Sequence, residues 1–171
     1  MTRVFHTFAP VADENSRVLI LGSFPSVKSR EQGFYYGHPQ NRFWKVMAAL
    51  FEEALPLTIE EKQRLLLRHG IAIWDVIESC ELVGSSDSSI RNVQVNDIAG
   101  LIKGSQIQHV FANGGKAFEL YERFGKPQTG LSAEKLPSTS PANAAWSLER
   151  LVEAWHAVKE WRPVSRENKK A

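Results

Sequence analysis

The chain has 171 residues, of which 43% are hydrophobic and 23% charged, with a formal net charge of +2. This length and composition predict one globular domain, residues 1–171, with a sizeable core. No apolar run is long enough to cross a bilayer, and the N-terminal MTRVFHTFAP lacks the apolar segment of a signal peptide. We therefore expect a cytoplasmic protein without a membrane partner. The charge is compatible with nucleic-acid binding but is too small to indicate it.

Cys80 is the only cysteine of the chain. A lone cysteine excludes an internal disulfide bond and a cysteine-built metal or iron–sulfur site. No group of His, Cys and carboxylate residues has the spacing of a zinc site either. We therefore expect no metal, and a monomer is the default expectation for the oligomeric state.

Short apolar runs along the chain predict buried strands, because β-forming residues without polar alternation are typical of strands covered on both faces. These runs lie at residues 17–22, 71–76, 107–112 and 134–136. Helical apolar spacing predicts helices between and after them, at residues 42–54, 58–69, 95–103, 116–124 and 144–161. Residues 1–16 look like an arm, and residues 162–171 like a flexible basic tail.

Capping signals indicate where these helices begin and end. Asn41 is expected to cap the first helix and Thr58 the second, with Glu61 completing a capping box. Gly125 and Pro127 are expected to end the fourth helix. The alternation of strands and helices predicts an α/β fold, a three-layer sandwich with a central four-stranded parallel sheet flanked by helices.

Polar residues follow each predicted strand at the point where it ends. They are Gly22-Ser23-Phe24-Pro25-Ser26, Asp75, Asn113-Gly114-Gly115 and Pro137-Ser138-Thr139-Ser140-Pro141. Because the carboxyl ends of parallel strands lie at one edge of a sheet, we expect these residues to form one cleft, with Tyr35 and Tyr36 nearby. Aromatic rings, amides, a carboxylate and hydroxyls suit a flat heteroaromatic ring bound beside a phosphate backbone.

Other common sites are missing from the sequence. It contains no GxxxxGK[ST] phosphate loop and no GxGxxG fingerprint after a strand. Neither Ser23 nor Ser26 sits in a GxSxG nucleophile elbow.

The segments GSFPSVKS, GFYYGHPQNRFW and LPSTSPAN resemble the uracil-DNA glycosylase superfamily, and most closely its hypoxanthine-DNA (deoxyinosine) glycosylase branch. The resemblance extends over residues 17–145. It implies a monofunctional DNA repair enzyme that flips a deaminated base out of DNA and hydrolyses its N-glycosidic bond without a cofactor. Phe24 stands where many members have a catalytic Asp or Asn, and Leu136 where many have His or Asn, as in the hypoxanthine branch. The single cysteine excludes the branches that carry an iron–sulfur cluster.

The resemblance also implies roles for individual residues. In the hypoxanthine branch the Asn of HPxN carries catalysis, which makes Asn41 the expected catalytic residue. Ser23, Phe24, Tyr36 and Asp75 match positions that contact the base, and Asn113 is expected to reach the base or a phosphate. We expect DNA contacts from these further residues: Ser26, Lys28, Ser86, Ser138, Thr139 and Ser140.

Cleavage is expected to pass through an oxocarbenium-like sugar, as in other glycoside hydrolysis. Asn41 would position water or bond the leaving purine. Asp75, when ionised, would accept a hydrogen bond from N1–H of hypoxanthine, a group that adenine lacks in its common form. This contact would discriminate between the two bases.

Simpler explanations remain open for several of these residues. Asn41 is also a plausible helix cap, Asp75 a turn residue, and Asn113-Gly114-Gly115 a tight turn. At the level of function, the alternatives are a uracil or mismatch-specific glycosylase and a catalytically silent DNA-binding module on the same fold. A small-molecule hydrolase using Ser23 or Ser26 is less consistent with the sequence, which shows no His and acid partners for either serine.

Overall fold

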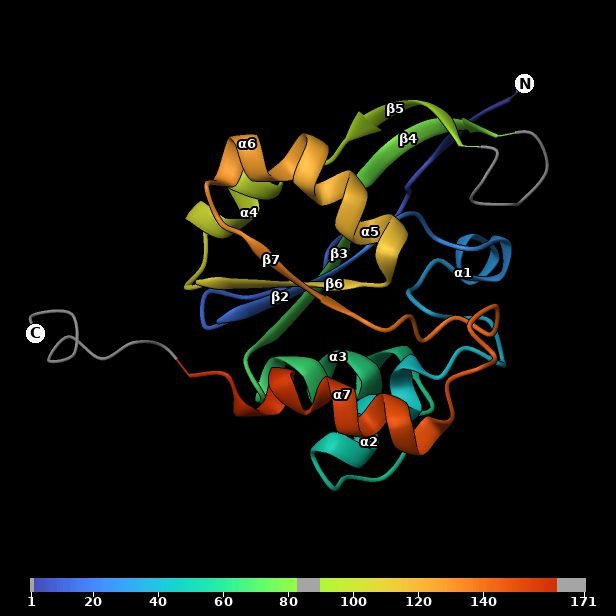
Figure 1. The fold of residues 1–171 in the computed structure, drawn as a ribbon, viewed down its shortest axis with the longest axis vertical. Coiled ribbons are helices and arrows are strands. Elements are labelled where there is room, and N and C mark those ends of the chain that lie inside the picture. Colours follow the sequence, from blue (N-terminus) through green and yellow to red (C-terminus); the bar gives the residue numbers. More distant parts are fainter. Residues whose placement is uncertain (1, 83–89, 163–171) are drawn as a thin grey trace, which may run out of the picture.

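The computed structural model describes residues 2–82 and 90–162. Parallel strands form its central sheet in the order β3-β2-β6-β7, which confirms the predicted four-stranded sheet (Figure 1). Their bounds are β2 (Val18–Gly22), β3 (Ile71–Asp75), β6 (His109–Asn113) and β7 (Ala133–Leu136). The register pairs Gly22 with Asp75 and Asn113 with Leu136, so the carboxyl ends of all four strands lie at one edge.

Helices cover both faces of this sheet, as the sequence predicts. On one face lie α2 (Phe43–Leu50), α3 (Ile59–Arg68) and α7 (Leu148–Glu160). On the other face lie α4 (Ile98–Lys103), α5 (Gly115–Leu120) and α6 (Lys126–Thr129). Every residue of β2 is buried, because its alternate side chains enter two separate cores. Within the described ranges, no helix has the length and apolarity needed to cross a membrane.

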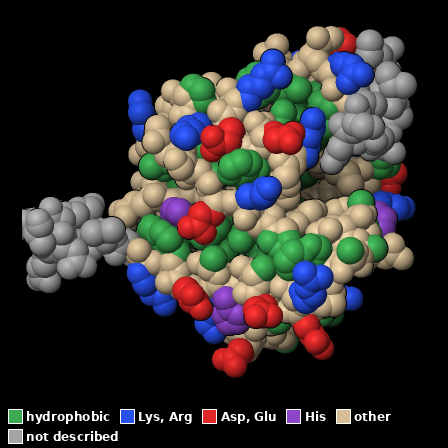
Figure 2. Space-filling model, in the orientation of Figure 1, with side chains coloured by type: hydrophobic (Ala, Val, Ile, Leu, Met, Phe, Trp, Pro, Cys, Tyr) green, Lys and Arg blue, Asp and Glu red, His purple; other side chains and the backbone are tan. Residues whose placement is uncertain are grey.

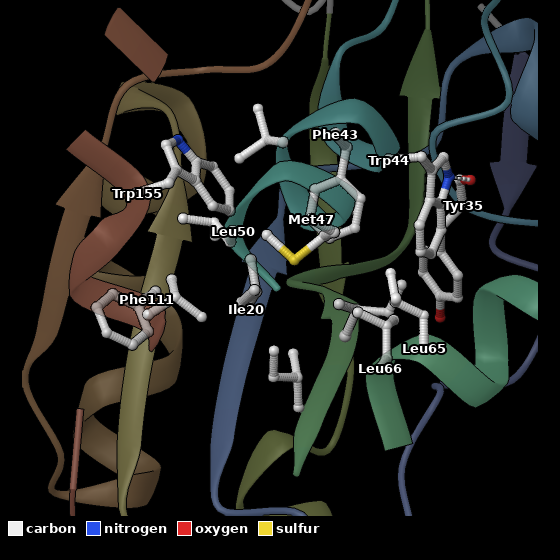
Figure 3. Close-up of a cluster of buried hydrophobic side chains, with 14 of the residues drawn as sticks. Ile20, Tyr35, Phe43, Trp44, Met47, Leu50, Leu65, Leu66, Phe111 and Trp155 are labelled. Atoms are coloured by element: carbon white, nitrogen blue, oxygen red, sulfur yellow. Dashed lines mark hydrogen bonds between the residues drawn. The ribbon is translucent and has the colours of Figure 1, made fainter. Parts of the chain in front are cut away.

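The core under α2 is rich in aromatic side chains. Phe43 and Met47 of α2 point toward Ile20 of the sheet, and Trp155 of α7 closes the cluster (Figure 3). Phe43 meets Trp155 edge to face at a centroid distance of 5.8 Å. The indole N–H of Trp44 donates to the carbonyl of Tyr35 at 3.1 Å, so this core also fixes the loop that precedes α2.

A second, antiparallel sheet was not expected from the sequence. It has the order β1-β4-β5 and consists of β1 (Thr2–Phe5), β4 (Ile77–Leu82) and β5 (Arg91–Val95). The prediction of an arm over residues 1–16 is therefore wrong for β1, which pairs with β4 from Thr2 opposite Leu82 to Phe5 opposite Ser79. This pairing joins residues far apart in the chain, and polar residues in β4 hide its strand character from a local reading.

One helix was not predicted, and two predicted helices begin later than expected. The loop after β2 contains a short helix, α1 (Val27–Gln32), and α7 begins at Leu148 after its cap Ser147. β5 ends at Val95, the residue expected to begin a helix, and α4 starts at Ile98 with Asp97 as its cap.

Gly125 and Pro127 do not end the helix that contains α5. The chain continues through a π-helical turn, Tyr121–Gly125, into α6, where the proline lies at the start of the helix and has no backbone N–H to leave unsatisfied. By contrast, the predicted capping box of Thr58 and Glu61 is confirmed. The serine-rich loop at 84–89 and the tail from 163 lie outside the described residues.

Glu53 connects the segment after α2 to the end of α3. Its carboxylate contacts Arg68 and His69, and the hydrogen bond with His69 is the main cause that lowers the pKa of Glu53. A carboxyl group whose pKa is lower in the folded than in the unfolded state stabilises the fold above its unfolded-state pKa. That contribution is lost as the pH falls through the folded-state value.

We expect Glu53→Gln to lower the free energy of unfolding above about pH 4.3, the ordinary value for Glu. The difference from the wild type should shrink as the solution becomes more acidic. Denaturant unfolding across the acid range measures it. Glu52→Gln is the matched control, because Glu52 is exposed and forms no ion pair with a described residue. A difference that stays constant with pH contradicts the prediction.

Candidate active site

A cleft of about 1020 Å³ lies at the edge where the parallel strands end. The last residue of β3 and the loops after β2, β6 and β7 contribute to its lining. The predicted site residues that line it are Ser23, Phe24, Ser26, Lys28, Tyr36, Asn41, Asp75, Asn113, Ser138, Thr139 and Ser140. Ser86 lies outside the described residues. The structure therefore brings together every predicted site residue that it describes, in a space comparable with ordinary ligand pockets.

Asp75 is almost fully buried and has a partner that the sequence analysis missed. His6 Nε2 lies 2.8 Å from Asp75 Oδ2, with side-chain exposures of 2% for His6 and 5% for Asp75. Oδ1 of Asp75 forms no hydrogen bond with a described residue. One carboxylate oxygen is thus held by the protein, and the other is available to a hydrogen-bond donor in the cleft.

The absence of a side chain at Gly22 leaves space for the Asp75 carboxylate. A Cβ atom at Gly22 would lie 2.4 Å from Asp75 Oδ1 and 3.3 Å from the Tyr36 hydroxyl oxygen. Since β2 and β3 pair these two residues side by side, any side chain at position 22 would displace the carboxylate. The glycine at the end of β2 is therefore needed for close approach rather than for an unusual backbone angle.

Tyr36 lies in a strained and desolvated position beside Asp75. Its φ of 54° is in the left-handed region, and its ring stacks on Phe43 at a centroid distance of 4.1 Å. Burial raises the pKa of Tyr36, the Asp75 carboxylate adds to the rise, and the neighbouring Asn113 amide opposes it. The hydroxyl oxygen is buried without a well-aligned hydrogen bond to any described residue. Strain and an unsatisfied polar group in one residue are typical of functional sites.

Asn41 belongs to a chain of hydrogen bonds that runs through Thr139 to Asn113. Asn41 Oδ1 accepts from the Phe43 backbone N–H at 2.9 Å and from the Thr139 hydroxyl at 2.9 Å. Asn113 Nδ2 donates to Thr139 Oγ1 at 3.0 Å, and the Thr139 N–H donates to Asn113 Oδ1 at 3.1 Å. The predicted capping role of Asn41 is thus present in part, because its side chain bonds the first turn of α2 while Arg42 occupies the cap position.

Arg42 anchors the loop that follows β7. Its guanidinium donates to the carbonyl oxygens of Ser140, Asn143 and Trp146, and its backbone N–H donates to the carbonyl of Thr139. This role was not predicted from the sequence. From the sequence, Arg42 could equally be a surface residue. Its partners are backbone carbonyls about a hundred positions away, and backbone groups leave no signal in the sequence.

The hydroxyl oxygens of Ser26, Ser138 and Ser140 accept hydrogen bonds from backbone N–H groups two or three residues further along the chain. Ser26 caps α1 through the Ser29 N–H, Ser138 Oγ accepts from the Ser140 N–H, and Ser140 Oγ accepts from the Ala142 N–H. Each hydroxyl oxygen retains accepting capacity, and the loops present their remaining polar groups to the cleft. Their placement is compatible with hydrogen bonds to the phosphates of a DNA backbone.

Basic side chains line part of the cleft. Lys28, Arg30, Lys116 and Lys135 line it, and Lys28 has only an exposed contact of 3.7 Å with Glu31. On the face shown in Figure 2, by contrast, basic and acidic side chains are interspersed. A small net charge is therefore compatible with a locally basic rim suited to phosphates.

No metal site is evident in residues 2–82 and 90–162, where no three His, Cys, Asp or Glu side chains gather in a way that could hold an ion. Phe24 is half-buried, with the Arg30 guanidinium 5.6 Å from its ring centroid. Among the described residues, none accepts from the backbone N–H groups of Ser23 and Phe24, which leaves these donors for a ligand.

The contact between His6 and Asp75 gives a stability prediction. We expect His6→Leu to lower the free energy of unfolding by about 3 kcal/mol, because it leaves a buried carboxylate without its partner. Adding Asp75→Asn should recover part of this loss, since an amide costs less to bury than an unpaired charge. Denaturant unfolding of the two single variants and the double variant measures the coupling.

His156→Leu is the matched control for this experiment. His156 lies on α7 and has no polar partner among the described residues, so its replacement should change stability by less than about 0.5 kcal/mol. An equal effect of His6→Leu and His156→Leu would show that the buried pair contributes nothing to the fold.

Comparisons with known proteins agree with this geometry. Residues 9–162 match the family model of the Uracil DNA glycosylase superfamily. A hypoxanthine DNA glycosylase of Methanosarcina acetivorans is 38% identical over 88% of this chain and 95% of its own length. Another, from Methanosarcina barkeri, is 33% identical over 86% of this chain and 93% of its own length.

Solved structures give the same result. A solution NMR structure from Methanosarcina acetivorans, named provisionally as a Uracil DNA glycosylase, superposes with a TM-score of 0.76 at 37% identity. It covers 88% of this chain and 93% of its own. On the family match, the identity to these relatives and the shared fold, the chain belongs to the Uracil DNA glycosylase superfamily.

Proposed function

We propose that this chain is a monofunctional DNA glycosylase that removes hypoxanthine from deoxyinosine in DNA and leaves an abasic site. The observation that carries the proposal is the meeting of the Asn41 amide and the Asp75 carboxylate in one cleft, beside Tyr36. The names of the relatives from Methanosarcina support hypoxanthine as the base. Within this proposal the chain acts as a single domain and a monomer, in the cytoplasm and without a metal or cofactor.

The reaction is a hydrolysis. The C1′–N9 bond breaks and its electron pair leaves with the base. A water oxygen bonds to C1′, the water loses one proton, and hypoxanthine gains one. The base must first be rotated out of the duplex, which costs a few kcal/mol and less for a poorly paired base.

Asp75 is the proposed reader of the base. Its Oδ1 has no protein donor among the described residues, and an ionised carboxylate accepts the N1–H of hypoxanthine. Adenine carries a lone pair at N1 and would face the same oxygen with repulsion. Tyr36 is the proposed surface for the extruded base, and the lysines and serines of the rim would hold the neighbouring phosphates.

The first test uses end-labelled duplexes with one deoxyinosine or one deoxyuridine, treated with alkali after incubation. Wild-type protein should give alkali-dependent breaks at inosine, and Asn41→Ala should reduce the single-turnover rate by about 100-fold or more. Asn15→Ala, in an exposed turn, is the matched control and should retain the rate. Breaks mainly at uracil would move the chain to the uracil branch. Binding of DNA without breaks would indicate a silent module.

A second test concerns discrimination between bases. Asp75→Asn should lower the ratio of inosine to adenine excision by about tenfold or more, because an amide can donate to N1 of adenine where a carboxylate cannot. The ratio is measured under single-turnover conditions on matched duplexes. Asp97→Asn makes the same chemical change at the cap of α4, which Asn also satisfies. An unchanged ratio in Asp75→Asn would remove Asp75 from base recognition.

A further inference from the structure

The orientation of the Asn41 amide is fixed by a group whose role in a hydrogen bond is unambiguous. The Phe43 backbone N–H lies 2.9 Å from one side-chain atom of Asn41. A backbone N–H can only donate, so this atom must be the amide oxygen, Oδ1. The same argument applies to Asn113, whose side-chain oxygen receives the Thr139 backbone N–H at 3.1 Å.

The direction of the remaining bonds follows from these two assignments. With its oxygen facing the Thr139 N–H, Asn113 has its Nδ2 toward Thr139 Oγ1, to which it donates at 3.0 Å. The Thr139 hydroxyl therefore accepts from Asn113 and has its own hydrogen left to donate. Asn41 Oδ1, at 2.9 Å, is the acceptor. Two backbone N–H groups thus set the polarity of the whole chain of bonds.

The consequence for Asn41 is that its oxygen has no accepting capacity left. An amide oxygen has two lone pairs, and here they receive the Phe43 N–H and the Thr139 hydroxyl. Asn41 Nδ2 donates to no described residue, and Asn41 lines the cleft. Asn41 therefore offers hydrogen-bond donors, and no acceptor, to whatever occupies the cleft.

We propose that Thr139 is a positioning residue that holds Asn41 as a hydrogen-bond donor to the leaving base, through a ring nitrogen or the carbonyl oxygen, and not as an acceptor that orients water. This inference rests on the proposed glycosylase function. As the C1′–N9 bond breaks, its electron pair passes to the base, and the acceptor atoms of the base become more negative. A fixed donor binds that charge more strongly in the transition state than in the ground state.

The burial of Thr139 agrees with this role. Its exposed fraction is 0%, and its backbone carbonyl accepts from the Arg42 N–H, so every polar group of the residue is engaged inside the protein. The expected direct contact of Thr139 with DNA would require the loop to open. Its placement supports an indirect role, through Asn41 and Asn113.

Asn41→Asp separates a donor from an acceptor at the same position. The ionised carboxylate has the size of the amide but no donor, so excision of inosine near neutral pH should fall by about 100-fold or more. The rate should recover in part toward acid pH, where a protonated carboxyl can donate, whereas Asn41→Ala should remain slow throughout. An Asn41→Asp variant as active as the wild type near neutral pH would overturn the inference, because a carboxylate is the better acceptor for water.

Thr139→Val and Thr139→Ser test the positioning role. Removing the hydroxyl should lower the single-turnover rate about tenfold or more while DNA affinity is unchanged, and Ser should restore it, since it keeps the hydroxyl. Thr129→Val is the matched control, because Thr129 also bonds through its hydroxyl but lies on α6, outside the cleft. A loss confined to DNA affinity, or one no larger than that of Thr129→Val, would overturn the inference.

The wild-type protein separates the two proposals. Without breaks at inosine in the wild type, the proposed function fails, and the inference fails with it. With wild-type breaks but an unimpaired Asn41→Asp, the glycosylase stands and the donor role alone is overturned. Thermal unfolding of each variant distinguishes a loss of rate from a loss of fold.

Discussion

The contact between residues 41–42 and the loop after β7 is the constraint on which the site depends. Arg42 binds that loop through three carbonyl oxygens and through its own N–H, and Asn41 receives the Thr139 hydroxyl. Neither segment has regular secondary structure to hold it in place. The Arg42 guanidinium supplies charge-assisted hydrogen bonds in place of the backbone hydrogen bonds of a sheet. They fix residues 41–42 to the loop after β7.

Around Asp75 the cleft depends on the contact with His6 and on the close approach of β2 to β3. Gly22 leaves room for the Asp75 carboxylate, and Tyr36 adopts a positive φ with its hydroxyl unsatisfied. Each of these features costs stability that the aromatic core beneath α2 must offset. A preorganised site of this kind is rigid before its ligand arrives, so less of the binding free energy is spent on ordering it.

Local signals in the sequence were sufficient to predict the parallel sheet and the gathering of polar residues at one edge of it. Apolar runs mark the buried strands, and the polar residues at their ends meet because parallel strands share an edge. His6 could not be found in this way, since it is brought to Asp75, 69 positions away, by the pairing of β1 with β4. The same holds for Arg42, whose partners are backbone carbonyls without a sequence signature. Pro127 was wrongly predicted to end a helix, because in the sequence a proline at the start of a helix cannot be told from one just after its end.

The cleft is assembled from both ends of the described chain, and this has a consequence for folding. His6 directly follows the N-terminal strand β1, whereas the loop that orients Asn41 follows the last strand of the parallel sheet. Contacts between distant parts of a chain form slowly, because loop closure must precede them. A partly folded molecule in which either of these contacts has not formed would lack a complete cleft. We therefore expect the recovery of excision activity after dilution from denaturant to require that both of these long-range contacts have formed.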